Sequence, residues 1–394
     1  MTSAESLLME GNIMDSQSEC VAVFRHELFK HSETFIAEQA ESVPGWRPFF
    51  IGRSRAADGK EAASFASWTD CANRPGLLHR IHQVATRSSR PYEAAIRSSG
   101  AKLIHAHFGV EGVYALPIAK ALRLPLITTF HGFDATTSGR NLLFSGKPSW
   151  LNYLRHRSTL ARRGDLFLCV SDHIRRKVVA LGFPEHKTHT HYIGVDVDKF
   201  GFDRECQPGR QFILHVGRLV EKKGAVDLVR AFSKIADRFP EVDLKIVGVG
   251  PLESVIREQI CRVGLSDRVR LLGALPHSEV RALMRRASLM CQPSVTARSG
   301  DTEGLPIVLM EAAASGVPVV STFHAGIPEL IEHGVTGLLS EEGDAEGLAR
   351  HLVRMLENSG VRECFAVAAR LTVERRFNIK CQSQKLGEIY GSLT

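Results

Sequence analysis

The sequence predicts an α/β protein made of two doubly wound, Rossmann-like domains. Short apolar runs of strand length alternate with helical patterns along the chain, which is typical of βαβ units and parallel sheets. At 394 residues the chain is long enough for two hydrophobic cores. Periodicity is lost at Asp198–Gly209, where Gly and Pro favour a linker. We expect a cleft between the domains, at the carboxyl ends of the strands, where ligands of this architecture bind.

The predicted elements follow this division in order. In the first half the expected buried strands are CVAVFRH, WRPFFIGR, KLIHAHFG, PLITTFHG and LFLCVS, with helices at 32–42, 73–98, 113–122 and 173–181. In the second half they are QFILHVGRL, VDLKIVGVG, VRLLGAL, LMCQPSV and PVVSTF, with helices at 225–239, 252–263, 278–286 and 305–315. These patterns predict a first domain at 20–200, a second at 201–376 and a C-terminal helix within 377–394. We expect residues 1–19 to be a disordered leader, because they lack a basic start and a sustained apolar segment.

The composition describes an ordinary globular protein, with 44% apolar and 24% charged residues. A net charge of +7 favours anionic partners such as phosphates or an acidic membrane surface, and it is too modest to indicate nucleic acid. The eight cysteines are scattered without a CxxC pair, which is typical of reduced thiols in a cytoplasmic protein. There is no apolar run of transmembrane length and no secretory signal, so we expect any membrane contact to be peripheral.

One stretch is a candidate for such a contact. Between Lys147 and Arg163, aromatic and aliphatic residues are mixed with arginines, as in basic amphipathic helices that lie on anionic lipid. The apolar members are Trp150, Leu151, Tyr153 and Leu154, and the basic members are Arg155, Arg157, Arg162 and Arg163. The alternative is a solvated helix that buries one stripe against the core.

Three loops of the second half lie after predicted strands, at the edge where ligands bind. GRLVEKKG places Arg218 and Lys223 there, where an arginine fork and a lysine charge can hold phosphate oxygens. The alternative is a solvated cluster that includes Lys222. VGVGPLE places Gly248 and Gly250 where the backbone either approaches a ligand or makes a tight turn. In the third loop, backbone groups near Leu275 could read a base edge.

Two glutamates, Glu303 and Glu311, stand eight positions apart in DTEGLPIVLMEAAASGVPVV. Carboxylates accept hydrogen bonds from vicinal hydroxyls, so each can hold a sugar ring. Along a helix this spacing spans roughly 12 Å, which suits the hexose and the ribose of a nucleotide-sugar. Its pyrophosphate would then lie near the helix N-terminus. The alternative is an amphipathic helix with an ordinary solvated glutamate.

Histidines mark the first half. His105 and His107 share one face of a strand, and His131 ends the next strand. With His189 and His191 they raise the possibility of a metal site, but no Cys, Asp or Glu lies at a recognised ligand spacing. We therefore predict no metal. Asp196 and Asp198 match the short DxD pattern that binds divalent cations in some sugar transferases, and we interpret them as a structural turn.

The motifs together resemble a known family. The ordered set GRLVEKKG, VGVGPLE, GALPHSEV, DTEGLPIVLMEAAASGVPVVST, AGIPELI and HGVTGLL resembles family 4 of the retaining glycosyltransferases, which have the GT-B fold. SETFI, HAHFG, TTFHGFD and YIGVDVDKF are similar to members that build bacterial exopolysaccharides, of the colanic-acid type. The resemblance implies that the second domain binds a UDP- or GDP-sugar, that the first binds the acceptor, and that the C-terminal helix returns to the first domain. It also implies chemistry without a metal or other cofactor.

The resemblance assigns roles to residues of the predicted loops. Arg218 and Lys223 would hold the pyrophosphate and neutralise the leaving nucleotide, and Glu311 would bind the ribose hydroxyls. Glu303 would face the donor hexose, and the amides of Gly304 and Leu305 would bind its hydroxyls or the phosphate. The remaining donor contacts would come from Gly248, Gly250 and Leu275. The residue matching the family histidine beside the reacting bond is His131, which with Glu303, Arg218 and Lys223 completes the predicted catalytic set.

The acceptor side departs from the family. Many relatives carry a glycine-rich loop after the first strand, whereas this chain has RHELFKHSETF, without a glycine between Cys20 and Pro44. We hypothesise instead a phosphate clamp of side chains, formed by Arg25, His26, Lys30 and Ser32. The predicted acceptor contacts are His107, Phe133, Asp134 and Lys30.

The expected function is transfer of a hexose, with retention at the anomeric carbon, from a nucleotide-sugar to an acceptor hydroxyl. The leading acceptor is a glycan on a lipid-linked carrier, which places the enzyme in the cytoplasm or peripherally on the inner face of the plasma membrane. Two alternatives stay open. One is a nucleotide-sugar 2-epimerase of the same fold, and the other is a non-catalytic scaffold that binds a nucleotide-sugar.

Overall fold

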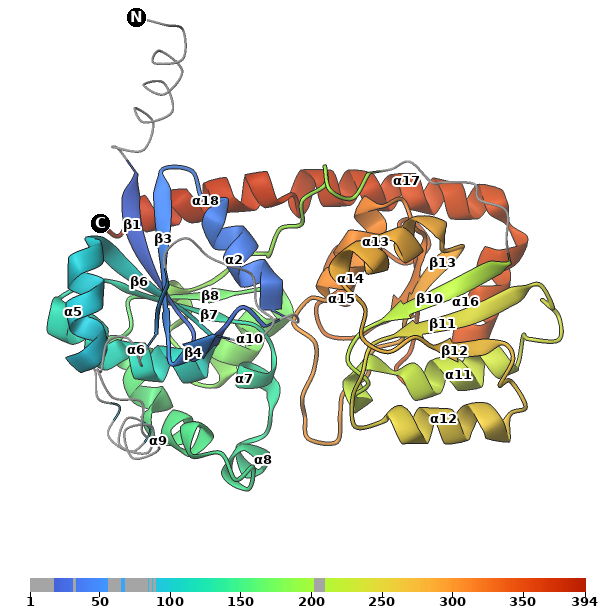
Figure 1. The fold of residues 1–394 in the computed structure, drawn as a ribbon, viewed down its shortest axis with the longest axis horizontal. Helices are drawn as coiled ribbons and strands as arrows, with labels where there is room; N and C mark the ends of the chain where they lie inside the picture. Colours follow the sequence, from blue (N-terminus) through green and yellow to red (C-terminus); the bar gives the residue numbers. More distant parts are fainter. Residues whose placement is uncertain are drawn as a thin grey trace, which may run out of the picture.

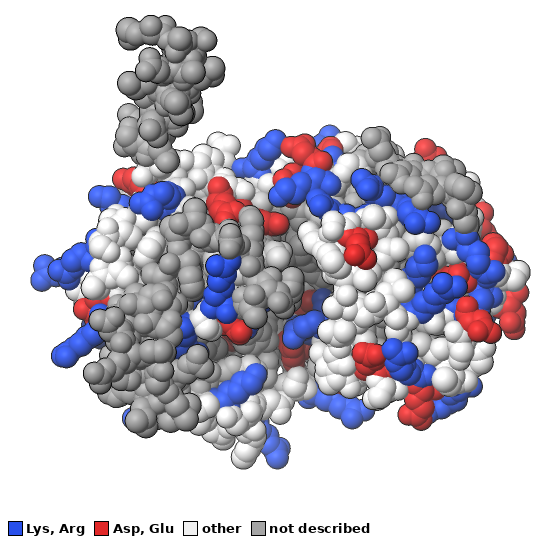
Figure 2. All heavy atoms as spheres, viewed as in Figure 1, with Lys and Arg blue, Asp and Glu red and all other residues white. Residues whose placement is uncertain are grey.

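The computed structural model describes residues 18–30, 33–55, 65–67, 84, 87, 90–201 and 210–394. Most of the predicted leader, most of the predicted helix at 73–98 and Ser32 of the hypothesised clamp lie outside the described residues. The described chain forms two α/β domains side by side, confirming the predicted fold class (Figure 1). On the face shown in Figure 2, Lys and Arg are interspersed with Asp and Glu over much of the second domain.

The first domain contains a seven-stranded sheet among the described residues. Its order is β5-β3-β1-β6-β7-β8-β9 and its neighbouring strands are parallel. The strands are β1 (Glu19–Phe24), β3 (Trp46–Gly52), β5 (Phe65–Ser67), β6 (Ala101–His107), β7 (Leu126–Phe130), β8 (Leu166–Cys169) and β9 (Thr188–Thr190), and a short pair is β2 (Glu27–Leu28) and β4 (Ser54–Arg55). The central strands are buried on both faces, which explains their continuous apolar sequences.

The helices of the first domain cover both faces of that sheet. They are α2 (Thr34–Glu41), α5 (Arg90–Ser99), α6 (Gly109–Leu122), α7 (Phe133–Thr136), α8 (Gly139–Leu143), α9 (Pro148–Arg163) and α10 (Asp172–Ala180), with the short η2 at Glu185–Lys187. Helix α6 begins four residues before the predicted helix at 113–122. Its apolar residues do not form a single stripe, because the helix is buried between the sheet and α9.

The second domain repeats the architecture. Its six-stranded parallel sheet has the order β12-β11-β10-β13-β14-β15. The strands are β10 (Gln211–Val216), β11 (Val242–Val247), β12 (Val269–Leu271), β13 (Leu289–Gln292), β14 (Val319–Thr322) and β15 (Leu338–Ser340). The helices are η3 (Glu221–Lys223), α11 (Ala225–Ser233), α12 (Glu253–Arg262), α13 (His277–Arg286), α14 (Ile307–Ala314), α15 (Ile327–Leu330) and α16 (Ala345–Glu357). Strand β15 and helix α16 were absent from the prediction.

The chain ends with two helices that lie end to end along both domains, α17 (Ser359–Arg376) and α18 (Ile379–Gly391) (Figure 1). Helix α17 packs on α14 and α16 of the second domain, and α18 packs on α2 of the first. Between them the backbone of Phe377 and Ile379 bonds to Val195, at N–O distances of 2.8 and 2.9 Å. Tyr390 of α18 is fully buried against Trp46. The last helix therefore belongs to the core of the first domain.

None of the helices in the described part of the chain has the length and apolar character needed to span a bilayer.

Candidate active site

The two domains meet where loops at the carboxyl ends of their sheets touch. The loop after β7 carries His131 and Gly132, and the loop before α14 carries Thr302 and Gly304. A Cβ atom added to Gly304 would lie 2.2 Å from the His131 carbonyl oxygen, and one on Gly132 would lie 3.2 Å from the Thr302 oxygen. The predicted site residue Gly304 therefore allows backbone from the two domains to come into contact.

An ion pair lies beside this contact. Lys223, from η3 after β10, places its Nζ 3.0 Å from Oε1 of Glu303, and both side chains are nearly buried. Burial by itself raises the pKa of Glu303, but the charges of Lys223 and Lys222 outweigh it and hold that pKa at about 2. Glu303 is therefore ionised at neutral pH, with a cation in direct contact.

The backbone of Glu303 is held by a second pair of side chains. Its N–H donates to Nε2 of His324, 3.1 Å away, and Nδ1 of His324 lies 2.6 Å from Oε1 of Glu342. Since Nε2 accepts a hydrogen bond, Nδ1 carries the proton and donates to Glu342. The sequence analysis missed both residues, although His324 adjoins the AGIPELI motif.

The two other cations of the predicted phosphate loop differ in their surroundings. Lys222 is buried, and its Nζ donates to Oδ1 of Asp301 at 3.0 Å and to the Thr302 oxygen at 3.1 Å. Arg218 is exposed, and no described residue forms an ion pair or hydrogen bond with its guanidinium. Lys222 thus fixes the loop before Glu303, while Arg218 is available to a ligand.

Two predicted donor-site glycines lie close to the protein's own backbone. A Cβ on Gly248 would lie 1.9 Å from the Gly217 oxygen, and one on Gly250 would lie 2.5 Å from the Leu219 oxygen. These glycines let two neighbouring loops of the protein pack backbone to backbone, and their contact with a donor stays a prediction. Leu275, on the third loop, is half-buried against the core.

Glu311 is buried on α14 and meets a histidine that the site prediction did not include. Nε2 of His277 lies 3.0 Å from its Oε1, and this hydrogen bond raises the pKa of His277 against the effect of burial. His277 begins α13 within the GALPHSEV motif. Helix α14 itself begins at Ile307, so Glu303 lies in the loop before it and the helical spacing estimate of roughly 12 Å does not apply. Leu305 is buried in the core beneath this loop.

The first-domain histidines form a stack. Ring centroids of His105 and His107 are 4.4 Å apart and those of His107 and His131 are 5.3 Å apart, with 3.1 Å between Nδ1 of His107 and Nε2 of His131. Burial lowers the pKa of all three well below the usual value, so the stack is neutral. Both nitrogens of His105 are engaged, by Tyr390 and Thr129, which argues against metal ligation. The described residues contain no cluster of three His, Cys, Asp or Glu side chains suited to a metal.

Two of the predicted acceptor contacts, His107 and Asp134, are buried. His107 is 2% exposed and touches His131 rather than open space. Asp134 is also 2% exposed and accepts hydrogen bonds from the N–H groups of Gly109, His131 and Gly132, at 2.8, 3.2 and 3.0 Å. His107 and Asp134 therefore contact His131 and hold it in place. Lys30 forms a partly exposed pair with Glu27 at 2.7 Å, and its acceptor contact stays a prediction. The fourth contact, Phe133, is half-buried and stacks on Trp150.

The hypothesised clamp is likewise occupied by protein groups. Arg25 forms a forked pair with Glu33, at 2.9 and 3.0 Å, and also bonds Glu111. Nδ1 of His26 lies 2.9 Å from Glu111, and burial lowers the pKa of His26 to about 4. The clamp prediction is therefore wrong for Arg25 and His26. Glu33 and Glu111 neutralise Arg25, and Glu111 also forms a hydrogen bond with His26.

The turn predicted at Asp196 and Asp198 is present in the structure. Oδ1 of Asp196 accepts hydrogen bonds from the N–H groups of Asp198 and Lys199, at 3.0 and 3.2 Å, and Asp198 pairs with Lys380 at 2.8 Å. The two aspartates form a structural turn at the crossing of the C-terminal helices.

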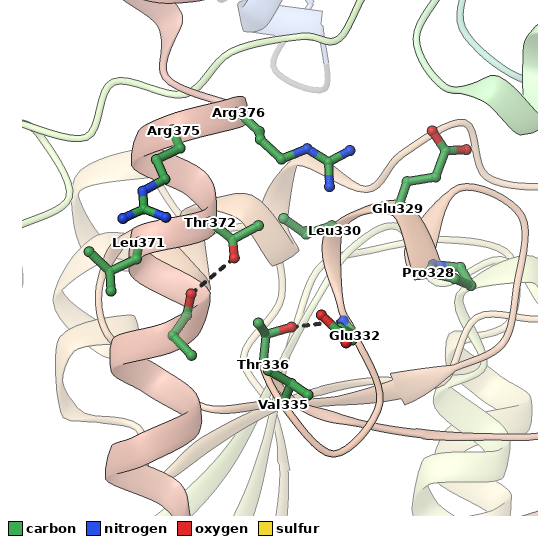
Figure 3. A pocket seen from close by; sticks show the side chains of 11 residues that line it. Pro328, Glu329, Leu330, Glu332, Val335, Thr336, Leu371, Thr372, Arg375 and Arg376 are labelled. Atoms are coloured by element: carbon green, nitrogen blue, oxygen red, sulfur yellow. Dashed lines mark hydrogen bonds between the residues drawn. The ribbon is translucent and has the colours of Figure 1, made fainter.

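A pocket of about 480 Å³ lies elsewhere, between α15 and α17. Figure 3 shows Arg375 and Arg376 on α17, and Pro328 and Glu329 on the opposite side of the pocket. The Glu329 carboxylate accepts the N–H groups of Asp172 and His173, at 2.9 and 3.0 Å, from the N-terminus of α10. This pocket borders a second interdomain contact and contains no predicted site residue.

The chain matches two family models that meet end to end. Residues 42–199 match the model described as Glycosyltransferase Family 4, and residues 197–372 match the one described as Glycosyl transferases group 1. The amylovoran biosynthesis glycosyltransferase AmsK of Erwinia amylovora is 35% identical, over 80% of this chain and 78% of that protein. WcaL of Escherichia coli strain K12, named for colanic acid biosynthesis, is 35% identical over 73% of this chain and 70% of its own length.

A solved structure confirms the fold. The Anabaena protein Alr3699/HepE, in complex with UDP and glucose, superposes with a TM-score of 0.74 at 22% identity, covering 95% of this chain and 100% of that one. The two domains, joined by crossing C-terminal helices, thus have the GT-B fold. The chain belongs to glycosyltransferase family 4, which confirms the resemblance drawn from its motifs.

Proposed function

We propose that the protein is a retaining hexosyltransferase that uses a UDP- or GDP-sugar and needs no metal ion. The observation that carries the proposal is the buried pair of Lys223 and Glu303 at the contact between the domains. An ionised carboxylate with a lysine beside it suits a site where a sugar bears hydroxyls and a phosphate leaves. The complex of HepE with UDP and glucose supports the choice of donor class.

In this proposal the second domain binds the donor along its loops. Arg218, which has no partner among the described residues, and Lys223 hold the pyrophosphate and stabilise its charge as it leaves. Glu311 binds the ribose, with His277 orienting its carboxylate. Glu303 binds the hexose, and the backbone of Gly304 and Leu305 faces the sugar hydroxyls or phosphate.

Catalysis would then rest on positioning and electrostatics. His131 is neutral, so it contributes hydrogen bonds rather than charge beside the anomeric carbon. No protein nucleophile is needed if the leaving phosphate accepts the proton of the attacking hydroxyl on the same face of the sugar. The positive charge that a metal supplies in other transferases would come from Arg218, Lys223 and the N-terminus of α14.

The acceptor is proposed to be a lipid-linked oligosaccharide in the synthesis of an exopolysaccharide or cell-surface glycan. The names of AmsK and WcaL, which refer to amylovoran and colanic acid biosynthesis, support this choice. An acceptor on a lipid requires work at a membrane surface, so we propose a cytoplasmic protein that binds peripherally to the inner face of the plasma membrane.

Nucleotide-sugar binding tests the donor assignment directly. Because a ligand that binds the folded state raises apparent stability, a UDP- or GDP-sugar is expected to raise the Tm of the purified protein, whereas ADP-sugars serve as the comparison. Incubation with the donor alone should leave the sugar configuration unchanged, since an epimerase would alter it without an acceptor.

Substitutions test the two halves of the donor site. Lys223→Ala and Glu311→Ala are each expected to lower turnover by at least about tenfold, through lost charge-assisted contacts. Lys234→Ala, which removes an exposed pair with Glu346, is the matched control and should retain full turnover. Near-normal rates in both site variants would refute the assignment.

A further inference from the structure

The segment from Gly139 to Gly164, comprising α8, α9 and the turn between them, carries charge of one sign. It contains Lys and Arg but no Asp or Glu, whereas the whole chain has 50 Lys and Arg against 43 Asp and Glu. The cationic residues are Arg140, Lys147, Arg155, Arg157, Arg162 and Arg163. All except Arg157 are exposed.

Within this cationic segment lies an exposed apolar tip, which we define as Leu143, Phe144 and Leu151. Their exposed fractions are 51%, 76% and 43%, and Phe144 is the most exposed large apolar residue of the described chain. Leu143 ends α8, Phe144 follows as its C-cap, and Leu151 lies in the first turn of α9, which packs on α8. Figure 1 shows α8 projecting at the lower edge of the first domain, and Figure 2 shows uncharged atoms there with Lys or Arg beside them.

The tip is not a displaced piece of the core. Helix α9 already buries its inner face, because Tyr153 and Leu160 are fully buried and Trp150 stacks on Phe133 with centroids 5.7 Å apart. Tyr153 also donates a hydrogen bond to the Asp134 oxygen at 2.7 Å. Of the apolar residues that the sequence suggested for lipid contact, Leu151 alone is classed as exposed. The apolar tip therefore does not contribute to the hydrophobic core of the first domain.

We propose that the apolar tip enters the headgroup region of an anionic bilayer, with Arg140, Lys147 and Arg155 paired to lipid phosphates around it. Transfer of a phenylalanine and two leucines from water to the bilayer is favourable, and the surrounding cations are attracted to a negatively charged surface. Anionic lipid satisfies both requirements at once, since it offers acyl chains beneath a layer of phosphates.

The position of the tip connects it to the reaction site. The second-domain loop that ends at Glu303 rests on the segment leading into α8: the Ser299 oxygen accepts from the backbone N–H of Ser138 at 3.2 Å and from Nδ2 of Asn141 at 2.8 Å. The N–H of Thr302 also donates to Oγ1 of Thr136 at 3.1 Å. A bilayer that holds the tip therefore lies beside one wall of the cleft. If the acceptor is lipid-linked, which rests on the proposed function, its glycan would reach the cleft directly from the membrane surface.

Vesicle binding tests the proposal with the full chain. The purified protein should co-sediment with vesicles of phosphatidylglycerol and phosphatidylcholine in equal parts, at least about tenfold more strongly than with phosphatidylcholine alone, as cationic surfaces do. The double variant Leu143→Ser/Phe144→Ser should lose most of this binding while keeping its Tm, because both residues are exposed. Val255→Ser, at an apolar site on α12 of the second domain that is 45% exposed, is the control and should bind normally.

A second measurement separates insertion from charge attraction. Phe144→Trp should give a blue-shifted emission that brominated acyl chains quench, and Arg140→Gln/Lys147→Gln/Arg155→Gln should weaken binding and reduce its salt dependence. Unchanged binding by the Leu143→Ser/Phe144→Ser variant, or no quenching in Phe144→Trp, would overturn the proposal and leave the tip as a site for an acidic protein. The donor assignment is tested independently of membrane binding, because stabilisation by a nucleotide-sugar is measured without vesicles.

Discussion

At the scale of single residues, buried carboxylates organise this protein. Glu111 is fully buried, and despite the opposing effect of burial the charge of Arg25 helps hold its pKa at about 2. Glu303 is held in the same state by Lys223. Asp134 differs, since burial raises its pKa to about 6 and its partners are backbone N–H groups rather than a full cation. The partner of each buried carboxylate therefore determines whether its pKa is low or high.

Removing the Asp134 carboxylate is expected to destabilise the fold. Asp134→Ala leaves the N–H groups of Gly109, His131 and Gly132 without their acceptor in a buried site, at a cost of at least about 2 kcal/mol. Urea unfolding measures this change. Asp198→Ala, which removes an exposed pair with Lys380, is the control and should cost less than about 1 kcal/mol. A smaller loss in Asp134→Ala than in the control would contradict the anchoring role.

At the scale of elements, loops connect the two domains at the cleft, in addition to the C-terminal helices that pack on both domains. The loop from Val295 to Thr302 is fastened to its own domain by Lys222 and by Glu342, which accepts the N–H of Thr296 at 2.7 Å. It reaches α7 and α8 of the first domain at its other side. Glu329 makes a comparable link to the N-terminus of α10, where a negative charge is favourable.

The contact at Gly304 gives a prediction for this loop junction. In Gly304→Ala the new methyl would collide with the His131 carbonyl, so the domains are expected to stay folded but held apart, with turnover lowered by at least about tenfold because positioning is lost. Activity measurements and small-angle scattering report the two effects. Gly360→Ala, where the new methyl meets nothing within 4 Å, is the matched control and should change neither. A compact, fully active Gly304→Ala protein would show that this contact does not govern closure.

At the scale of the whole molecule, buried histidines set the dependence of stability on pH. Burial lowers the pKa of a set of them below the usual 6.5: His26, His105, His107, His131, His173, His191 and His215. The stability that they contribute is fully present above pH 6.5, where the unfolded chain is also neutral. It is lost as the pH falls from 6.5 towards about 4, because unfolding then takes up protons.

We therefore expect the Tm to fall between pH 7 and pH 5. Each histidine adds up to about 1.4 kcal/mol per pH unit in this window. Asp134 acts in the opposite sense, since its raised pKa makes the fold more stable as pH falls through about 6, but it is a single group. Glu111 and Glu303, with pKa values of about 2, lose their contribution only below about 4.5.

Calorimetry across this pH range provides the measurement. His107→Gln should flatten the slope of Tm against pH, whereas His186→Gln, at an exposed position, should leave it unchanged. A Tm that stays constant or rises on acidification would show that these histidines do not govern the response.

The sequence by itself determined the fold class and the candidate loops. Hydrophobic periodicity acts over a few residues, so it located the central strands of both sheets and put Lys223 and His131 at strand ends. It also identified the turn at Asp196. The three-residue edge strand β15 was not predicted, although β12, which is equally short, was.

Only the tertiary structure decided which groups are paired. Arg25 and Glu111 are 86 positions apart, and their contact follows from packing that no local pattern records. Lys223 and Glu303 come from separate loops of the second domain. The same reason explains α9, where the sequence showed apolar residues but only the neighbouring helix decided that Tyr153 is buried and Leu151 exposed. Burial and charge pairing are properties of surfaces brought together, so they exist only once the chain has folded.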